Sequence, residues 1–121
     1  MADDRIELRG LRLLGICGVL PEEQDRAQPL EVDLDVLADL TAAGRSDDLA
    51  DTIDYGAVCT RVELTVTGSR VALLEHLAER IAEVVLALDP RISGVTVGIR
   101  KLRPPVPQDL ATSGVCITRH R

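Results

Sequence analysis

One short stretch, residues 30–40 (LEVDLDVLADL), constrains the fold more than any other part of this 121-residue chain. Acidic side chains fill most of the positions between its apolar ones, and Leu37 is the exception. The apolar positions are every second residue: Leu30, Val32, Leu34, Val36, Ala38 and Leu40. Because successive side chains of a strand point to opposite faces, this alternation predicts a β-strand with one buried and one solvated face. Such a strand is typical of an antiparallel sheet that is covered on one side only.

Three other segments also predict strands. They are residues 5–16, 91–101 and 114–120, and a bulge is expected where Gly10 interrupts the first of them. The polar residues 18–29 predict a loop between the first two strands.

Two helices are predicted after the second strand. A turn-rich connection leads to a helix that begins near Asp54, a competent N-cap, and ends at Gly68. Residues 70–90 predict a second helix that is strongly amphipathic. Its apolar stripe is Leu74, Leu77, Ala78, Ile81, Val84, Val85 and Leu88.

The predicted order is therefore strand, strand, helix, helix, strand, strand. It defines an α+β fold class: a single domain over residues 1–121, with a four-stranded antiparallel sheet and two helices on one face of it. Such a sheet keeps two edge strands, and regular edges are an aggregation hazard unless they are paired. Pairing the edges between subunits would remove the hazard, which favours a ring-shaped homo-oligomer.

Charge and composition exclude several classes of partner. The formal net charge of −6 argues against nucleic acid or an anionic membrane. No apolar run has the length of a transmembrane helix, and the first ten residues lack the regions of a signal peptide. Cys17, Cys59 and Cys116 are widely spaced and are expected to be reduced thiols, so a cytoplasmic location is predicted. With only two histidines and no ligand spacing, no metal site is predicted.

Lys101 is the first candidate functional residue. It lies in RKLRPPVPQ, residues 100–108, and it continues the apolar face that Val95, Val97 and Ile99 form. Burial disfavours the charged ammonium, so the pKa of Lys101 should fall, which suits general acid/base or imine chemistry. The alternative is that the strand ends at Ile99 and that the lysine reaches out to water.

Glu75 is the second candidate. It lies in the first turns of the second predicted helix, near the positive end of the helix dipole. A carboxylate there can accept two hydrogen bonds from a ligand with an amidine-like edge. The alternative is a solvated stripe shared with Glu79 and Glu83.

Two further places have residues suited to chemistry. In the loop after Gly18, either Glu22 or Glu23 could act as a base or bind a diol, although paired loop carboxylates usually face solvent. Tyr55 is the only aromatic residue of the chain, which invites a functional interpretation beside the simpler one of half-buried packing.

Four segments carry a resemblance to a known family: DRIELRGLRLLGICGV, SDDLADTIDYGAV, LLEHLAERIAE and RKLRPPVPQ. In this order and spacing, along essentially the whole chain, they resemble the dihydroneopterin aldolases of folate biosynthesis. The resemblance implies the tunnelling fold, in which four subunits close their sheets into a barrel and two rings stack into an octamer. It also implies active sites between subunits.

The resemblance implies a metal-independent and cofactor-free retro-aldol cleavage. 7,8-Dihydroneopterin would give 6-hydroxymethyl-7,8-dihydropterin and glycolaldehyde, with epimerisation as a side activity. No lysine Schiff base is implied, because the substrate's own conjugated C=N takes up the electrons when the carbon–carbon bond breaks.

The resemblance also implies a role for each matching residue. Lys101 matches the catalytic lysine, and Tyr55 matches the tyrosine that helps protonate the carbon left after cleavage. Glu75 matches the glutamate that grips the pterin's 2-amino and ring N–H edge. The backbone amide of Leu74 would add to that grip on the pterin. Thr52 and Ile53 match a pocket wall that the neighbouring subunit supplies. Glu23 matches the glutamate near the hydroxyl groups of the substrate's side chain, and Glu22 is its alternative.

The chain departs from the family pattern at three positions. Cys17 stands where histidine is common, Leu102 where proline is common, and Ala27 where glycine is frequent. Two other functions stay open. One is an epimerase of dihydroneopterin or its triphosphate, and Arg103 is the basic residue that could contact the phosphates. The other is a non-catalytic pterin-binding or assembly protein.

Overall fold

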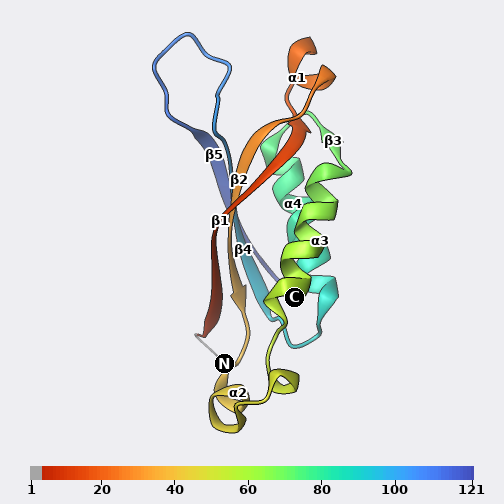
Figure 1. The fold of residues 1–121 in the computed structure, drawn as a ribbon, viewed down its shortest axis with the longest axis vertical. Coiled ribbons are helices and arrows are strands. Elements are labelled where there is room, and N and C mark those ends of the chain that lie inside the picture. Colours follow the sequence, from red (N-terminus) through yellow and green to blue (C-terminus); the bar gives the residue numbers. More distant parts are fainter. Residues whose placement is uncertain (1–3) are drawn as a thin grey trace.

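The computed structural model describes residues 4–121 (Figure 1). The first three residues of the predicted domain lie outside the described range. The strands are β1 (Arg5–Cys17), β2 (Gln28–Leu37), β3 (Arg70–Val71), β4 (Gly94–Lys101) and β5 (Ser113–His120). The helices are α1 (Pro21–Asp25), α2 (Thr41–Ser46), α3 (Tyr55–Thr67) and α4 (Leu74–Leu88), with a 3₁₀ turn at Leu49–Asp51. This is the predicted α+β class.

The sheet has five strands in the order β3-β1-β2-β4-β5 and is mixed, so the predicted four-stranded antiparallel sheet is wrong in this detail. β3 pairs parallel with the end of β1, through Ile16 and Cys17. Its residues, Arg70 and Val71, were expected to open the second helix. Instead the carbonyl of Val71 accepts a hydrogen bond from the Gly18 N–H at 3.0 Å, which satisfies backbone groups at the end of β1.

Both predicted connections contain short helices, α1 and α2, in place of plain loops. α1 starts with Pro21, which suits the first position of a helix, and places Glu22 and Glu23 in its first turn. Helices of five or six residues show too little periodicity for a hydrophobic pattern to reveal them.

Local signals at two positions act as predicted. Gly10 has a φ of +72°, and the β1–β2 register shifts between Leu8 and Leu11, so the bulge is confirmed. The side chain of Asp54 accepts hydrogen bonds from the N–H groups of Gly56 and Ala57, so the N-cap of α3 is confirmed.

The core is an aliphatic layer between the sheet and the pair α3 and α4, which cover one face of it (Figure 1). It includes Leu30, Val32, Leu34 and Val36 from β2, Val58, Val62 and Val66 from α3, Leu77, Ile81 and Val85 from α4, and Val95, Val97 and Ile99 from β4. α1 and β3 lie at one end of the molecule and α2 at the other (Figure 1). Within residues 4–121, no helix combines the length and the apolar character needed to cross a membrane.

Replacing Ile81 by alanine should lower the free energy of unfolding by about 2–5 kcal/mol, because the side chain is fully buried between α4 and the sheet. Urea denaturation followed by circular dichroism measures the change. Glu83→Ala, on the exposed face of the same helix, is the matched control. Equal stabilities of the two variants would contradict the packing described here.

Candidate active site

The register between β2 and β4 positions Lys101 at the border of the core. Along β4 the buried residues Val95, Val97 and Ile99 pair with buried residues of β2, and Lys101 pairs with buried Leu30. Lys101 therefore stands on the face that the helices cover. Its side chain is 14% exposed, so it is mostly withdrawn from bulk water.

The partner of Lys101 is Glu23. The Lys101 ammonium donates a hydrogen bond to the Oε2 atom of Glu23 at 2.7 Å, and the Glu23 side chain is 8% exposed. Gln28 Nε2 also donates to Oε2, at 3.2 Å, and to the carbonyl of Cys17 at 2.8 Å. Burial opposes ionisation of Glu23, but the bonds from Lys101 and Gln28 outweigh it and hold the pKa of its carboxyl below the usual value.

The turn before α1 gives Glu23 room to reach Lys101. A Cβ on Gly18 would lie 2.2 Å from the Glu23 Cδ atom, so only glycine fits at this position. Gln24 closes the turn, since its side-chain amide donates to the carbonyls of Gly18 and Val71. Burial also raises the pKa of the neighbouring Cys17 thiol, which lies in the core.

The N-terminus of α4 borders the same place. Leu74 is the first residue of α4, so its backbone N–H has no acceptor within the helix. Glu75, in the first turn, is exposed, and it lines an open pocket of about 460 Å³ together with Leu74, Glu23 and Lys101. The remaining lining residues come from the turn after β1, the segment before α4, Pro105 and the start of β5.

Thr52, Ile53 and Tyr55 are not part of this pocket. Arg91 donates to the carbonyl of Thr52 at 2.9 Å, which holds that segment beside the start of β4. Lys101 is at the other end of β4, about 23 Å away at 3.3 Å per strand residue. Ile53 is buried, whereas Tyr55 is 61% exposed at the start of α3.

Glu22 points elsewhere. It is exposed and lines a second pocket with Arg26 and Arg103, whereas Glu23 is the carboxylate that contacts Lys101. The sequence left these two glutamates open, because one residue of register in a short helix decides between them. It marked Gly18 as the start of the turn but gave no sign that Gln28 binds Glu23 or that a Cβ at position 18 would clash with Glu23, because both depend on contacts made across the loop.

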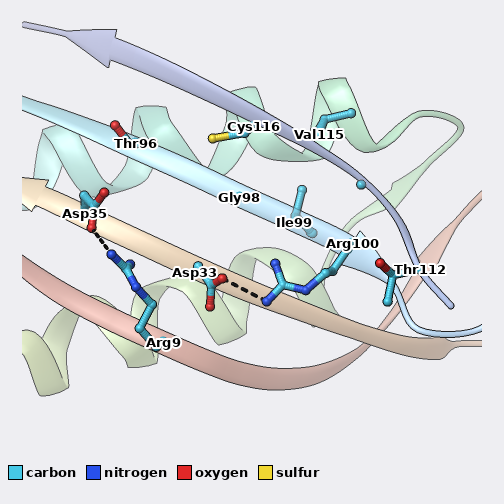
Figure 2. A pocket seen from close by; sticks show the side chains of 11 residues that line it. Arg9, Asp33, Asp35, Thr96, Gly98, Ile99, Arg100, Thr112, Val115 and Cys116 are labelled. Carbon is cyan, nitrogen blue, oxygen red and sulfur yellow. Dashed lines mark hydrogen bonds and ion pairs between the residues drawn. The ribbon is translucent and has the colours of Figure 1, made fainter.

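A separate hollow of about 400 Å³ lies on the helix-free face of the sheet (Figure 2). Figure 2 shows Arg9 beside Asp35 and Arg100 beside Asp33, at 2.6 and 2.8 Å. Arg100 also pairs with Glu31 at 2.5 Å. Because acidic partners neutralise Arg9 and Arg100, the described residues that line this hollow offer an anion no unpaired cation.

The fold and the pocket together define a class of protein. In the described residues 4–121, no group of three or more His, Cys, Asp or Glu side chains could hold a metal ion. What the pocket contains is a proton donor and a proton acceptor in contact, beside a helix N-terminus with a free carboxylate. A proton donor and a proton acceptor held in contact at a pocket are typical of enzymes that work by acid–base catalysis.

Comparisons with known proteins give the family. The family model described as dihydroneopterin aldolase matches residues 6–118. A dihydroneopterin aldolase from Staphylococcus epidermidis is 42% identical over 117 residues, with 97% of each chain covered. The chain belongs to the dihydroneopterin aldolase family.

Two solved structures of the same family are similar over nearly the whole chain. One from Vibrio cholerae, assigned to dihydroneopterin aldolase, has a TM-score of 0.91 at 30% identity, with both chains fully covered. The Escherichia coli dihydroneopterin aldolase in complex with neopterin has a TM-score of 0.87 at 33% identity, covering 96% of this chain and 98% of that one.

Replacing Lys101 by methionine should raise the pKa of Glu23, because burial then opposes ionisation with only Gln28 left as a side-chain donor. Carboxyl ¹³C NMR titration measures the change, and Arg61→Met on exposed α3 is the control. A lowered pKa stabilises the fold above the unfolded-state pKa, and this stabilisation is lost as the pH falls through the folded-state value. In the Lys101→Met variant, the free energy of unfolding should therefore not fall in this way as the pH is lowered. An unchanged Glu23 pKa would show that the ion pair is absent in solution.

Proposed function

We propose that this chain cleaves 7,8-dihydroneopterin by a retro-aldol reaction to 6-hydroxymethyl-7,8-dihydropterin and glycolaldehyde. The observation that carries the proposal is the 2.7 Å contact between Lys101 and Glu23 at the edge of a pocket that Glu75 also lines. Membership of the dihydroneopterin aldolase family supports it.

Glu75 and Leu74 hold the pterin ring in this proposal. The carboxylate of Glu75 accepts hydrogen bonds from the 2-amino group and the adjacent ring N–H, a two-point contact that fixes the orientation of the ring. The Leu74 backbone N–H, free at the start of α4, donates to an acceptor on the same edge of the ring. The side chain of the substrate then lies over Glu23 and Lys101.

Lys101 and Glu23 move the protons. A proton leaves the side-chain hydroxyl whose carbon becomes the aldehyde, the neighbouring carbon–carbon bond breaks, and the electron pair enters the ring C=N. A proton then returns to the carbon left on the ring. A donor and an acceptor in direct contact can serve both steps, since each proton transfer leaves the pair able to perform the reverse transfer.

Tyr55 acts from a neighbouring subunit, with Thr52 and Ile53 as that subunit's pocket wall. Two features support an assembly of this kind, a tetrameric ring or two stacked rings. Tyr55 does not line the Lys101 pocket of its own chain, and it follows a segment held beside the start of β4, whereas Lys101 ends that strand. β5 is an outer strand of the sheet, and β3 covers only Ile16 and Cys17 of β1. A cytoplasmic location fits the three free cysteines.

Wild-type protein incubated with 7,8-dihydroneopterin should form 6-hydroxymethyl-7,8-dihydropterin and glycolaldehyde in equal amounts, as separated by chromatography. Lys101→Ala should lower kcat at least about 100-fold and still bind the pterin, because it removes a proton-transfer group. Glu75→Ala should lose binding instead. Dihydromonapterin as the only product would indicate an epimerase, and near-wild-type rates for Lys101→Ala would refute the mechanism.

The shared site predicts complementation between two inactive variants. Each of the variants Lys101→Ala and Tyr55→Ala lacks a group that the proposal needs for proton transfer. A mixture of the two should regain activity when they are unfolded together and reassembled. About a quarter of randomly assembled interfaces would combine two intact halves. The control is each variant reassembled alone. Activity in the mixture no higher than the mean of the two controls would place Tyr55 and Lys101 outside a shared site.

A further inference from the structure

A second pocket, of about 480 Å³, adjoins the candidate active site and has a basic rim. It shares Glu23 and Pro105 with the pocket that contains Lys101 and Glu75, so the two pockets lie on either side of these residues. Arg26 lines it from the end of α1, and Arg103 lines it from the loop after β4. Two segments 77 positions apart in the sequence thus bring cations to the same hollow.

These two arginines differ from those on the helix-free face of the sheet. There Arg9 and Arg100 are neutralised by Asp35, Asp33 and Glu31. Among residues 4–121, by contrast, neither Arg26 nor Arg103 has an acidic partner within ion-pair distance. Their guanidinium groups are exposed and free to bind a ligand.

The balance of charge in the second pocket favours an anion. Glu23 is already paired with Lys101, so among the described residues that line this pocket Glu22 is the one carboxylate without an ion-pair partner. Two guanidinium groups outweigh it. In a chain with a net charge of −6, such a local cluster of cations makes this pocket more favourable for an anion than the acidic parts of the surface.

We propose that Arg26 and Arg103 form a subsite for a phosphate group at the end of the substrate's side chain, so that the protein also accepts the 3′-phosphate ester of 7,8-dihydroneopterin. The inference rests on the proposed function, because it places the pterin ring at Glu75 and its side chain over Glu23. The side chain then continues toward the two arginines. Guanidinium groups bind phosphate oxygens through pairs of hydrogen bonds, which suits them to this group.

The chemistry of the ester would be that of the parent compound. The same carbon–carbon bond breaks, its electron pair enters the ring C=N, and the ring carbon regains a proton. No phosphorus–oxygen bond is broken, so the phosphate leaves with the two-carbon fragment as glycolaldehyde phosphate. The other product, 6-hydroxymethyl-7,8-dihydropterin, is unchanged, and no oxidant or reductant is needed.

The test compares kcat/KM for the 3′-phosphate ester with kcat/KM for 7,8-dihydroneopterin in the same preparations of the full-length protein. In the wild type the ester should be the better substrate. In Arg26→Ala/Arg103→Ala the ratio of ester to parent should fall at least about tenfold, because charge-assisted hydrogen bonds to the phosphate are lost. The double variant Arg45→Ala/Arg61→Ala removes the same charge from α2 and α3, outside the pocket, and should leave the ratio unchanged.

Glu22→Gln is a second variant with the opposite expected sign. It removes the unpaired carboxylate from the same pocket, so the preference for the ester should rise. Equal ratios in the two arginine double variants would overturn the inference. A second result would also overturn it: inorganic phosphate inhibits cleavage of the parent in the wild type but not in Arg26→Ala/Arg103→Ala, and kcat/KM for the ester is no higher than for the parent. The pocket would then bind free phosphate and not the phosphate of the ester.

The outcomes separate this inference from the proposed function. If the wild type cleaves 7,8-dihydroneopterin and the arginine variants do not change the ratio, only the phosphate subsite is refuted. If the wild type cleaves neither compound, the proposed function fails. Calorimetric titration of the ester would then still test the subsite, because its affinity should fall in Arg26→Ala/Arg103→Ala and stay the same in Arg45→Ala/Arg61→Ala.

Discussion

The ion pair between Lys101 and Glu23 is the constraint on which the rest of this site depends. A lysine at the end of an apolar strand loses most of its hydration, and such a charge is tolerated only beside a partner of opposite sign. Supplying that partner explains the construction of residues 18–28: a glycine without a Cβ to block Glu23, a short helix that turns Glu23 inward, and Gln28 on its other side. Lys101 is also the only lysine among the chain's 14 lysines and arginines. An ammonium can give up its proton where a guanidinium cannot, which suits a group that must both donate and accept.

The sheet and α4 give this pair its surroundings. The β2–β4 register fixes where Lys101 emerges, and α4 begins at the same end, so its unsatisfied N–H groups and Glu75 border the pocket. The sheet and α4 thus supply Lys101, Leu74 and Glu75, whereas the short helix α1 supplies Glu23. Cys17 ends β1 and is buried in the core, and Ala27 lies just before β2. Leu102 extends the β2–β4 pairing by donating its N–H to the carbonyl of Pro29 at 3.2 Å.

Sequence periodicity predicted the elements that bury a regular face, namely β1, β2, α3, α4, β4 and β5. It missed β3, α1 and α2, because two to six residues are too few for a period to show and their conformation depends on partners distant in sequence. The two-residue period of β4 placed Lys101 on the correct face of the sheet. The short helix α1 has no such period, so the sequence could not choose between Glu22 and Glu23. The family resemblance implied that Tyr55 reaches Lys101 from a neighbouring subunit, and in the structure Tyr55 begins α3 whereas Lys101 ends β4 of the same chain.

The proposed sharing of one site between Tyr55 of one subunit and Lys101 of the next would couple assembly with catalysis for a physical reason. Val19 and Leu73 are 69% and 52% exposed beside the Lys101 pocket, and Leu49 and Tyr55 are 70% and 61% exposed at the opposite end. Large apolar side chains gathered at both ends of so small a domain favour association, because burying them releases them from water. If the end bearing Tyr55 docks against the end bearing Lys101 of the next subunit, the same burial that stabilises the assembly also completes the pocket and excludes water from it. Within such a closed pocket the contacts of Lys101, Glu23 and Glu75 with a ligand become electrostatically stronger than in the isolated chain. In the proposed assembly, burial of these exposed apolar side chains would hold the two parts of the proposed site together.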